Sequence, residues 1–339
     1  MMKGKKGILL INLGTPNSPS TADVRTYLDE FLSDPRVIDL NPIGRFFLVK
    51  GLILPLRSPK SAATYQKIWT ENGSPLLYYT IRQKELLEQR LGNEYMVEYA
   101  MRYQNPSIES VLEKFRKAKV FDIKIIPLFP QYASATTGSV HDMVMAVVKN
   151  WQIVPNIEFV NSFPDHPIMI DAFAEIGSKY DHAAYDHVLF SFHGLPKRQL
   201  IKADPSGCHC QQVENCCDKI NVNNQYCYSA QSHLTARSIA ERLNIPKEKY
   251  SICFQSRLGR DPWVEPYTSE VITKLAKEGK KKLLVFCPAF VADCLETIFE
   301  IGIEYDEEFK HMGGEKVQLV HGLNEHPRWI DALENIARN

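Results

Sequence analysis

Short apolar runs alternate along the chain with longer stretches in which apolar residues recur every three or four positions. The short runs are nearly continuous, as in parallel strands buried on both faces, and the longer stretches have the period of amphipathic helices. Eight strands are predicted, at 7–12, 95–101, 122–128, 156–160, 187–192, 250–254, 282–286 and 316–320. Helices are predicted between them, for example at 107–119, 167–180, 229–243 and 327–337. The alternation predicts an α/β fold with parallel sheets.

The eight predicted strands divide into two sets of four, and the two sets resemble each other. Residues 157–176 align without gaps to residues 317–336, with seven of twenty positions identical. Residues 7–16 align in the same way to residues 187–196 and share a Leu, a Gly and a Pro at matching places. Because both pairs occur in the same order along the chain, we expect two copies of one α/β unit.

The loops that follow the predicted strands are the places to look for chemistry, because ligands of such sheets bind beyond the carboxyl ends of the strands. None of these loops has a dinucleotide-binding or Walker pattern. His193 follows the fifth strand and Glu296 follows the seventh. A histidine and a carboxylate that converge there could form an open site for a first-row divalent metal, and the histidine could accept protons near neutral pH. The alternatives are that His193 caps a backbone group and that Glu296 lies in the first turn of a helix capped by Asp293.

Five of the eight cysteines fall within a polar stretch that has the character of a loop insertion, at Cys208, Cys210, Cys216, Cys217 and Cys227. The start of the chain lacks the features of a signal peptide, so clumped cysteines favour metal binding over disulfides. Three interpretations stay open: free thiols, a four-cysteine zinc site, and an iron–sulfur cluster.

A cluster of this kind needs four ligands, and the loop offers more candidates than that. Cys227 borders the next helix and could be structural. Alternatively only one of Cys216 and Cys217 is a ligand, because neighbouring side chains diverge in an extended chain. His209 is a fallback ligand.

Charge and hydropathy restrict the partners and the compartment. The 40 Lys and Arg balance the 40 Asp and Glu, which argues against a nucleic-acid binder. No run reaches the roughly 18 apolar residues of a membrane-spanning helix, so we expect a cytoplasmic protein. Residues 43–56 contain nine large apolar residues among fourteen, beside Arg45, Lys50 and Arg57. That segment predicts either a buried helix or an apolar lip that meets a hydrophobic ligand or a bilayer surface.

Five motifs together resemble one enzyme family, the ferrochelatases. They are LLINLGTP at 9–16, ENGSPL at 71–76, LFPQYASATTGS at 128–139, SFHGLP at 191–196 and PAFVADCLETIFEI at 288–301. The motifs lie in the family order, and the resemblance runs from about residue 6 to about residue 335. It is closest to the Gram-negative form, without a C-terminal extension.

The resemblance implies two Rossmann-like, chelatase-type domains, each a four-stranded parallel sheet flanked by helices, with a porphyrin cleft between them. The first domain is expected at 1–183, with a porphyrin-binding lip at about 36–60. The second is expected at 184–339, with the cysteine-rich insertion at about 204–228. The final helix, 327–337, is expected to pack on the first domain, as in the family.

The implied activity is that of a lyase that inserts Fe²⁺, its substrate, into protoporphyrin IX in the last step of haem synthesis. His193 matches the family's active-site histidine, assigned to metal binding or to abstraction of a pyrrole proton. Glu296 matches the acidic partner across the cleft, so both are candidate metal ligands and catalytic residues. The 43–56 segment matches the lip that admits the porphyrin and touches the membrane, which implies peripheral contact with the inner membrane. Many members have a histidine at the position of Cys294, so no role is transferred to that residue.

Some microbial members carry a [2Fe–2S] cluster, and one group holds it on internal cysteines near this place, which favours the iron–sulfur interpretation of the cysteine loop. Arg36, Lys67 and Arg102 are candidates to hold the propionates, although each taken alone also fits a solvated surface residue. The alternative functions are a chelatase for coproporphyrin or cobalt and a non-catalytic sensor that binds haem or an iron–sulfur cluster.

Overall fold

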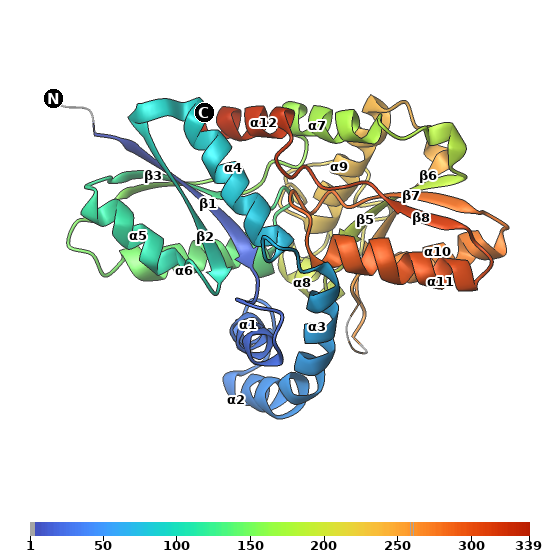
Figure 1. The fold of residues 1–339 in the computed structure, drawn as a ribbon, viewed down its shortest axis with the longest axis horizontal. Coiled ribbons are helices and arrows are strands. Elements are labelled where there is room, and N and C mark those ends of the chain that lie inside the picture. Colours follow the sequence, from blue (N-terminus) through green and yellow to red (C-terminus); the bar gives the residue numbers. More distant parts are fainter. Residues whose placement is uncertain (1–3, 258, 260) are drawn as a thin grey trace. The chain divides into compact units, whose positions relative to one another are not determined.

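The computed structural model describes residues 4–257, 259 and 261–339 and divides into two compact units (Figure 1). The first unit contains the chain up to Phe129, together with Ser134–Asn161 and Leu333–Asn339. The second contains Pro130–Ala133 and Ser162–Ala332. The four residues Pro130–Ala133 therefore group with the second unit, although their neighbours on both sides group with the first.

The first unit is built on a parallel sheet in the order β2-β1-β3-β4. Its strands are β1 (Lys6–Gly14), β2 (Tyr95–Tyr103), β3 (Asp122–Pro127) and β4 (Asn156–Phe159). Its helices are α1 (Thr21–Ser33), α2 (Pro42–Phe46), η1 (Phe47–Ile53), α3 (Leu54–Ile68), α4 (Pro75–Leu91), η2 (Gly92–Glu94), α5 (Ile108–Lys117), η3 (Ser134–Gly138) and α6 (Ser139–Val148).

The core of the first unit lies where α5 and α6 pack on one face of the sheet. Leu9 and Ile11 of β1 alternate toward this face, and they meet Leu112 and Phe115 of α5. α4 contacts β1 and β2. The end of the last helix also joins this unit, where Lys124 on β3 donates to the backbone oxygen of Ile336 at 3.3 Å.

The second unit repeats the same strand order, β6-β5-β7-β8. Its strands are β5 (His187–His193), β6 (Tyr250–Gln255), β7 (Lys282–Phe286) and β8 (Lys316–Leu319). Its helices are α7 (Pro167–Gly177), η4 (His182–Ala184), α8 (Lys197–Lys202), α9 (Tyr228–Arg242), η5 (Lys247–Lys249), α10 (Thr268–Lys277), η6 (Glu296–Tyr305), α11 (Asp306–His311) and α12 (Pro327–Arg338), whose last residues belong to the first unit.

The core of the second unit lies between its sheet and the helices α10, η6 and α11. Leu189 and Val285 on the strands pack with Ile272 on α10 and Ile301 on η6 in one buried cluster. α7 packs against α9. A methyl group on Gly177 at the end of α7 would lie only 2.7 Å from the ring of Phe286, so this close approach of helix and strand requires glycine.

The structure confirms the predicted α/β fold with two four-stranded parallel sheets. All eight predicted strands are present and differ from prediction only at their ends. The shared strand order agrees with the repeat found in the sequence. The boundary at 183/184 and the packing of the final helix stay predictions, because the two units are defined by contacts in space and not by one cut along the chain.

The apolar segment 43–56 is not a buried helix, so that alternative was wrong. It forms α2, η1 and the start of α3, and large apolar side chains along it are exposed, with exposed fractions from 55% to 72%: Ile43, Phe46, Phe47, Leu52 and Leu56. Only Val49 and Leu54 within it are buried hydrophobic residues. Within the described residues, no helix combines the length and the apolar character needed to cross a membrane.

Candidate active site and cysteine loop

The strand order of the second unit places a switch point between β5 and β7, because the chain leaves these two neighbouring strands toward opposite edges of the sheet. The carboxyl ends of strands at such a point are the usual ligand site of an open α/β sheet. His193 is the last residue of β5, and Glu296 begins η6, the helix that follows β7. The fold therefore brings both sequence-predicted residues to the same edge of one sheet.

His193 is half-buried, and its ring orientation is set by its own loop. Its Nδ1 lies 2.7 Å from the backbone oxygen of Gly194. A carbonyl oxygen only accepts, so Nδ1 carries the proton in the neutral ring and Nε2 is left as the acceptor. The rings of Trp263 and Phe290 lie 6.3 and 6.5 Å from the imidazole. A backbone-capping contact is thus present, and it leaves the second nitrogen available for chemistry.

Gly194 permits the close approach that places His193. Its N–H donates to the backbone oxygen of Gln255 at 2.8 Å. A methyl group on Gly194 would lie 2.9 Å from that same oxygen, which no ordinary contact allows. The loop after β5 is therefore held tightly against the end of β6.

Glu300 is a candidate site residue that the sequence analysis missed. Its carboxylate accepts from the backbone N–H of Ser256 at 2.8 Å and from the Ser256 hydroxyl at 2.5 Å. It also accepts from the Gln255 amide at 3.0 Å and from the Tyr305 hydroxyl at 3.3 Å. Ser256 adopts a left-handed backbone conformation with φ of 66°, a strained geometry of the kind that collects at functional sites.

Electrostatics connects Glu300 to the two predicted residues. Burial raises the pKa of Glu300, the charge of Glu296 raises it further, and Ser256, His193 and Gln255 oppose the rise. His193 and Glu296 therefore both lie close enough to Glu300 for their charges to act on it. The signal that could have revealed Glu300 is its spacing: it lies four residues after Glu296 on the same wide helix, so both carboxylates fall near one face.

Cys294 and Asp293 lie just before η6 and are both buried. Burial, followed by the neighbouring Glu296 carboxylate, raises the pKa of the Cys294 thiol well above its usual value. Asp293 does not act as a backbone cap for the helix: its carboxylate accepts from Thr297 at 2.9 Å and from His321 at 3.0 Å. Although burial opposes ionisation, hydrogen bonds from His321, Asn324 and Gly322 lower the pKa of Asp293. This pair of residues anchors the start of η6 and leaves the Cys294 thiol protonated.

Four of the five clustered cysteines converge in the second unit. Cys210 and Cys217 both hydrogen-bond to Cys227, and the sulfurs of Cys216 and Cys217 lie 3.9 Å apart. Cys208 is exposed and bonds instead to the Ser206 hydroxyl. The expectation that the side chains of Cys216 and Cys217 diverge was wrong, because the chain turns there instead of running extended.

Cys227 is the centre of this group by its contacts, and whether it is a ligand or a structural residue stays a prediction. It is the N-cap of α9. Hydrogen bonds from Cys210 and Cys217, and then the backbone N–H groups of Ala230 and Ser229, lower the pKa of Cys227 despite its burial. The helix N-terminus and two thiol donors thus favour a thiolate at this position.

Two polar side chains, the partly exposed Asp204 and the buried Asn224, hold the cysteine loop in shape. Asp204 accepts from the backbone N–H groups of His209 and Cys210, both at 2.9 Å. Asn224 donates to the backbone oxygen of Cys216 at 2.7 Å and to that of Lys219 at 2.9 Å. A small cavity is lined by Leu200, Asp204, His209, Cys210, Cys216, Asn223, Asn224 and Cys227.

The four converging cysteines have the number and kind of ligands that a four-thiolate cluster needs. In this structure their thiols contact one another directly. Four sulfurs linked by direct contacts match the ligand set of an iron–sulfur cluster. Across residues 4–257, 259 and 261–339, no group of three or more His, Cys, Asp or Glu side chains is arranged as a metal site. The Nε2 of His209 is buried without a hydrogen-bond partner.

The candidate propionate ligands differ in their surroundings. Arg102 is committed to Asp34, whose carboxylate it contacts at 2.6 Å in a mostly buried ion pair. Arg36 lies 3.1 Å from the hydroxyl of Ser134 and 3.4 Å from the carboxylate of Asp142. Arg102 thus has an internal acid as its partner, and Arg36 remains the more accessible candidate.

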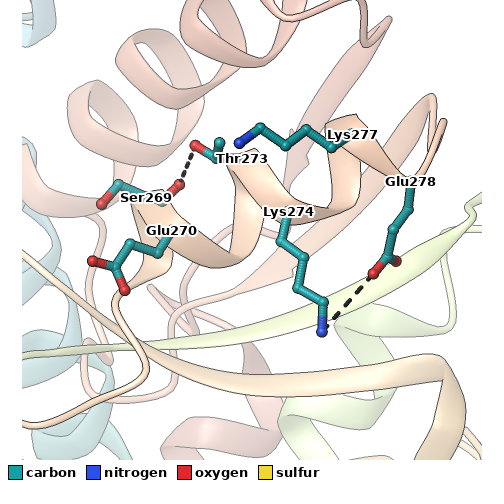
Figure 2. Close-up of a pocket in the computed structure, with 6 residues that line it drawn as sticks. All are labelled: Ser269, Glu270, Thr273, Lys274, Lys277 and Glu278. Carbon is teal, nitrogen blue, oxygen red and sulfur yellow. Dashed lines mark hydrogen bonds and ion pairs between the residues drawn. The ribbon is translucent and has the colours of Figure 1, made fainter.

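A surface hollow of the second unit is not a candidate site. Figure 2 shows that its lining comes from α10 and its C-cap residue Glu278: Ser269, Glu270, Thr273, Lys274, Lys277 and Glu278. Lys274 and Glu278 form an exposed ion pair at 3.8 Å, and Thr273 donates to the backbone of its own helix. These are the groups of a solvated helix face.

Comparison with known proteins gives consistent results. The sequence profile of the Ferrochelatase family matches residues 5–339. The ferrochelatase of Legionella pneumophila strain Lens is 45% identical over 334 residues, which cover 98% of both chains. The ferrochelatase of Coxiella burnetii strain Dugway 5J108-111 is 44% identical over 338 residues, which cover 98% of this chain and 93% of that protein.

A solved structure shows the fold. The sirohydrochlorin chelatase SirB from Bacillus subtilis subspecies spizizenii, in complex with cobalt, aligns with a TM-score of 0.54. The alignment covers 98% of this chain and 94% of that one, with 11% sequence identity. The two-sheet architecture is therefore shared with a chelatase of very different sequence.

Proposed function

Because this chain belongs to the ferrochelatase family, we propose that it is a lyase that inserts Fe²⁺ into protoporphyrin IX to form protohaem. The observation that carries the assignment is that His193, Glu296 and Glu300 lie at the switch-point edge of the second sheet, where the charges of His193 and Glu296 both act on Glu300. A base and two carboxylates at one ligand edge are what metal insertion requires.

The chemistry follows from the proton balance. A free-base porphyrin releases two N–H protons as one Fe²⁺ enters, so the metallated ring is neutral and the two positive charges leave as protons. His193 accepts a pyrrole proton at Nε2, because Nδ1 is already committed to the Gly194 carbonyl. Binding a bent ring more tightly than a flat one lowers the barrier, since bending exposes the nitrogen lone pairs to the metal.

Glu296 and Glu300 serve the metal and the protons differently. Glu296 begins η6 and is proposed to contact Fe²⁺ together with His193, an open ligand set that releases the ion readily. Glu300 is half-buried, and its raised pKa makes it a better proton acceptor than an ordinary carboxylate. It is proposed to receive protons that leave the ring.

An insertion assay with Fe²⁺ or Zn²⁺ tests these roles. His193→Ala and Glu296→Gln are expected to lower the insertion rate by about 10²- to 10⁴-fold, the usual contribution of a positioned acid or base. His311→Ala and Glu270→Gln are matched controls, because both side chains are exposed on other helices. Parental rates in the first pair would overturn the site.

The same assay separates the alternative functions. Faster insertion into coproporphyrin than into protoporphyrin IX, or faster insertion of Co²⁺ than of Fe²⁺, would assign a different substrate. Porphyrin binding without insertion of any metal would assign a non-catalytic sensor.

We propose that the cysteine loop holds a [2Fe–2S] cluster on Cys210, Cys216, Cys217 and Cys227. The mutual contacts of these four sulfurs support this ligand set, and the exposed Cys208 is left out of it. When bound, such a cluster joins four points of the loop covalently and can carry an electron.

The test is the visible spectrum of freshly purified protein together with its iron and sulfide content. A coloured protein that bleaches with dithionite is expected, with the colour lost in Cys217→Ser and kept in Cys208→Ser. His209→Ala tests the fallback ligand, and is expected to keep the colour. A colourless protein that contains zinc, or one without metal, would overturn the cluster.

We further propose that the exposed apolar surface of residues 43–56 admits the porphyrin and rests on the membrane surface. Its apolar side chains lie beside basic ones, as in segments that bind anionic bilayers. Sedimentation with anionic lipid vesicles tests this, with binding expected to fall in the double variant Phe46→Ser, Phe47→Ser. Ile153→Ser with Val154→Ser is the matched control, because those residues are also exposed and apolar. Equal binding by both double variants would overturn the proposal.

A further inference from the structure

Gln231 joins three separate segments of the second unit through one buried side chain. It lies on α9, is only 2% exposed, and sits one helical turn from Cys227. Its side-chain oxygen accepts from the backbone N–H of Tyr132 at 2.7 Å. Its side-chain nitrogen donates to the backbone oxygen of Gln225 at 2.6 Å and to the hydroxyl of Ser162 at 3.0 Å. A buried amide that accepts one hydrogen bond and donates two restricts the geometry of all three segments it contacts.

One of these segments, Pro130–Ala133, follows the carboxyl end of β3. In the order β2-β1-β3-β4 the switch point of the first sheet lies between β1 and β3, so this segment stands at a ligand edge. A second bond holds it to α9, from the Gln131 amide to the hydroxyl of Thr235 at 2.9 Å. Both Gln131 and Thr235 are buried. Hydrogen bonds to α9 therefore restrict the conformation of Pro130–Ala133, the four residues that continue the chain shortly after β3.

The other segment is the end of the cysteine loop. Gln225 lies two residues before Cys227, the centre of the thiol group. Tyr226, between them, stacks edge-on with Tyr132 at a ring separation of 5.8 Å. The loop and the Pro130–Ala133 segment thus touch each other through two aromatic rings as well as through Gln231.

We propose that Gln231 is a positioning residue that couples the order of the cysteine loop to tetrapyrrole binding at the Pro130–Ala133 segment. A loop held by its cysteines keeps the backbone oxygen of Gln225 and the ring of Tyr226 in place, and these in turn keep Gln231 and Tyr132 in the arrangement that meets the ring. Because such a linkage is reciprocal, tetrapyrrole binding must stabilise the loop as much as an ordered loop strengthens tetrapyrrole binding. The proposal rests on the function proposed above.

Hydrogen exchange of the whole protein measures the linkage. Adding protoporphyrin IX is expected to slow amide exchange in residues 204–228 of the parental protein, although those residues lie on a different segment from the one that binds. In Gln231→Ala that slowing is expected to vanish, and the KM for protoporphyrin is expected to rise by roughly threefold to tenfold with kcat unchanged, as the loss of one or two buried hydrogen bonds predicts.

Two further variants separate positioning from general damage. Gln231→Glu keeps the acceptor for Tyr132 and loses the donor to Gln225, so the 128–139 region is expected to stay protected while the response of 204–228 is lost. Gln212→Ala removes a comparable bond, to the backbone oxygen of Gly207 at 3.1 Å, that stays inside the loop. It is expected to leave the linkage intact.

The outcomes are distinct from those of the earlier proposals. No slowing in the parental protein, or equal slowing in Gln231→Ala, would overturn the coupling. A colourless protein would overturn the cluster alone, because the exchange response can be measured whatever the loop holds. Porphyrin that binds and slows exchange without any metal insertion would overturn the activity and leave the coupling standing.

Discussion

Asp34 in the first unit is buried and Glu300 in the second is half-buried, and each accepts several close hydrogen bonds in opposite electrostatic surroundings. Asp34 accepts from Tyr103 and Ser139 and also from the guanidinium of Arg102 at 2.6 Å. The donors that the structure describes around Glu300 are neutral groups of Ser256, Gln255 and Tyr305. The same fold therefore holds one acid with a full positive partner and leaves another dependent on neutral groups.

The charge of the neighbouring groups distinguishes a carboxylate that supports the fold from one that can take part in proton transfer. A carboxylate paired with arginine keeps its charge and is poorly suited to exchange protons. A half-buried carboxylate that is held only by neutral donors has a raised pKa and can take up a proton when one is offered. Two units with one strand order thus carry different functions because of the charges placed next to these acids.

The largest expected effect comes from breaking the pair in the first unit. Arg102→Ala leaves Asp34 buried without its cation and is expected to lower the free energy of unfolding by about 3–5 kcal/mol. Urea and thermal unfolding measure it. Arg116→Ala removes one partner of an exposed pair with Glu113 and is expected to leave the midpoint unchanged. Equal midpoints for both variants would contradict the structural role of Asp34 and Arg102.

A smaller effect is expected on catalysis from the second acid. Glu300→Gln keeps the shape of the side chain and removes its ability to take a proton, so the insertion rate is expected to fall roughly ten- to a hundredfold while the protein stays folded. The insertion assay measures it, with Glu270→Gln as the control. A parental rate would show that Glu300, like Asp34, only supports the fold.

The pH dependence of stability sharpens the same comparison. The folded state binds the Glu300 proton more tightly than the unfolded state, because burial raises its pKa. Its contribution to stability is therefore complete below the ordinary carboxyl pKa of about 4.3 and is lost as pH rises through the folded pKa. The unfolding free energy of Glu300→Gln, minus that of the parental protein, is expected to increase from pH 4 to pH 8. A flat difference would mean that Glu300 titrates normally.

The smallest expected effect concerns one donor of Glu300. Tyr305→Phe removes a 3.3 Å hydrogen bond and leaves those of Ser256 and Gln255 in place. The unfolding free energy is expected to change by about 1 kcal/mol or less, and the insertion rate by less than about threefold. A larger loss of rate than in Glu300→Gln would assign the chemistry to the tyrosine.

The sequence predicted the sheets well because each strand is a nearly continuous apolar run, and such a pattern has few alternatives. It also predicted that His193 ends β5 and that Glu296 lies in the segment after β7, since those positions depend on where the two strands stop, while the roles of both residues stay predictions. Glu300 was missed because its importance depends on the wide helix η6 and on Ser256, which lies forty-four positions away along the chain.

The cysteine loop shows a different limit. The sequence shows how many candidate ligands the loop has, but it does not show which of them contact one another. Cys227 became central only because α9 begins at it, so that helix amides and two thiols point to one sulfur. Arg102 was predicted to hold a propionate or to be a solvated surface residue, and its ion pair with Asp34 was missed because the two residues lie far apart in the sequence and such a pair leaves no local signal.

The placement of Leu333–Asn339 in the first unit has a consequence for biosynthesis. These residues follow every strand of both units along the chain, yet they supply the backbone oxygen that meets Lys124 on β3 and the carboxylate of Glu334 beside Arg90. Nascent domains generally fold in order from the N-terminus, but here the first unit cannot be completed until the whole second sheet has been translated. The surface of the first unit that receives these residues therefore stays uncovered while the second unit is made.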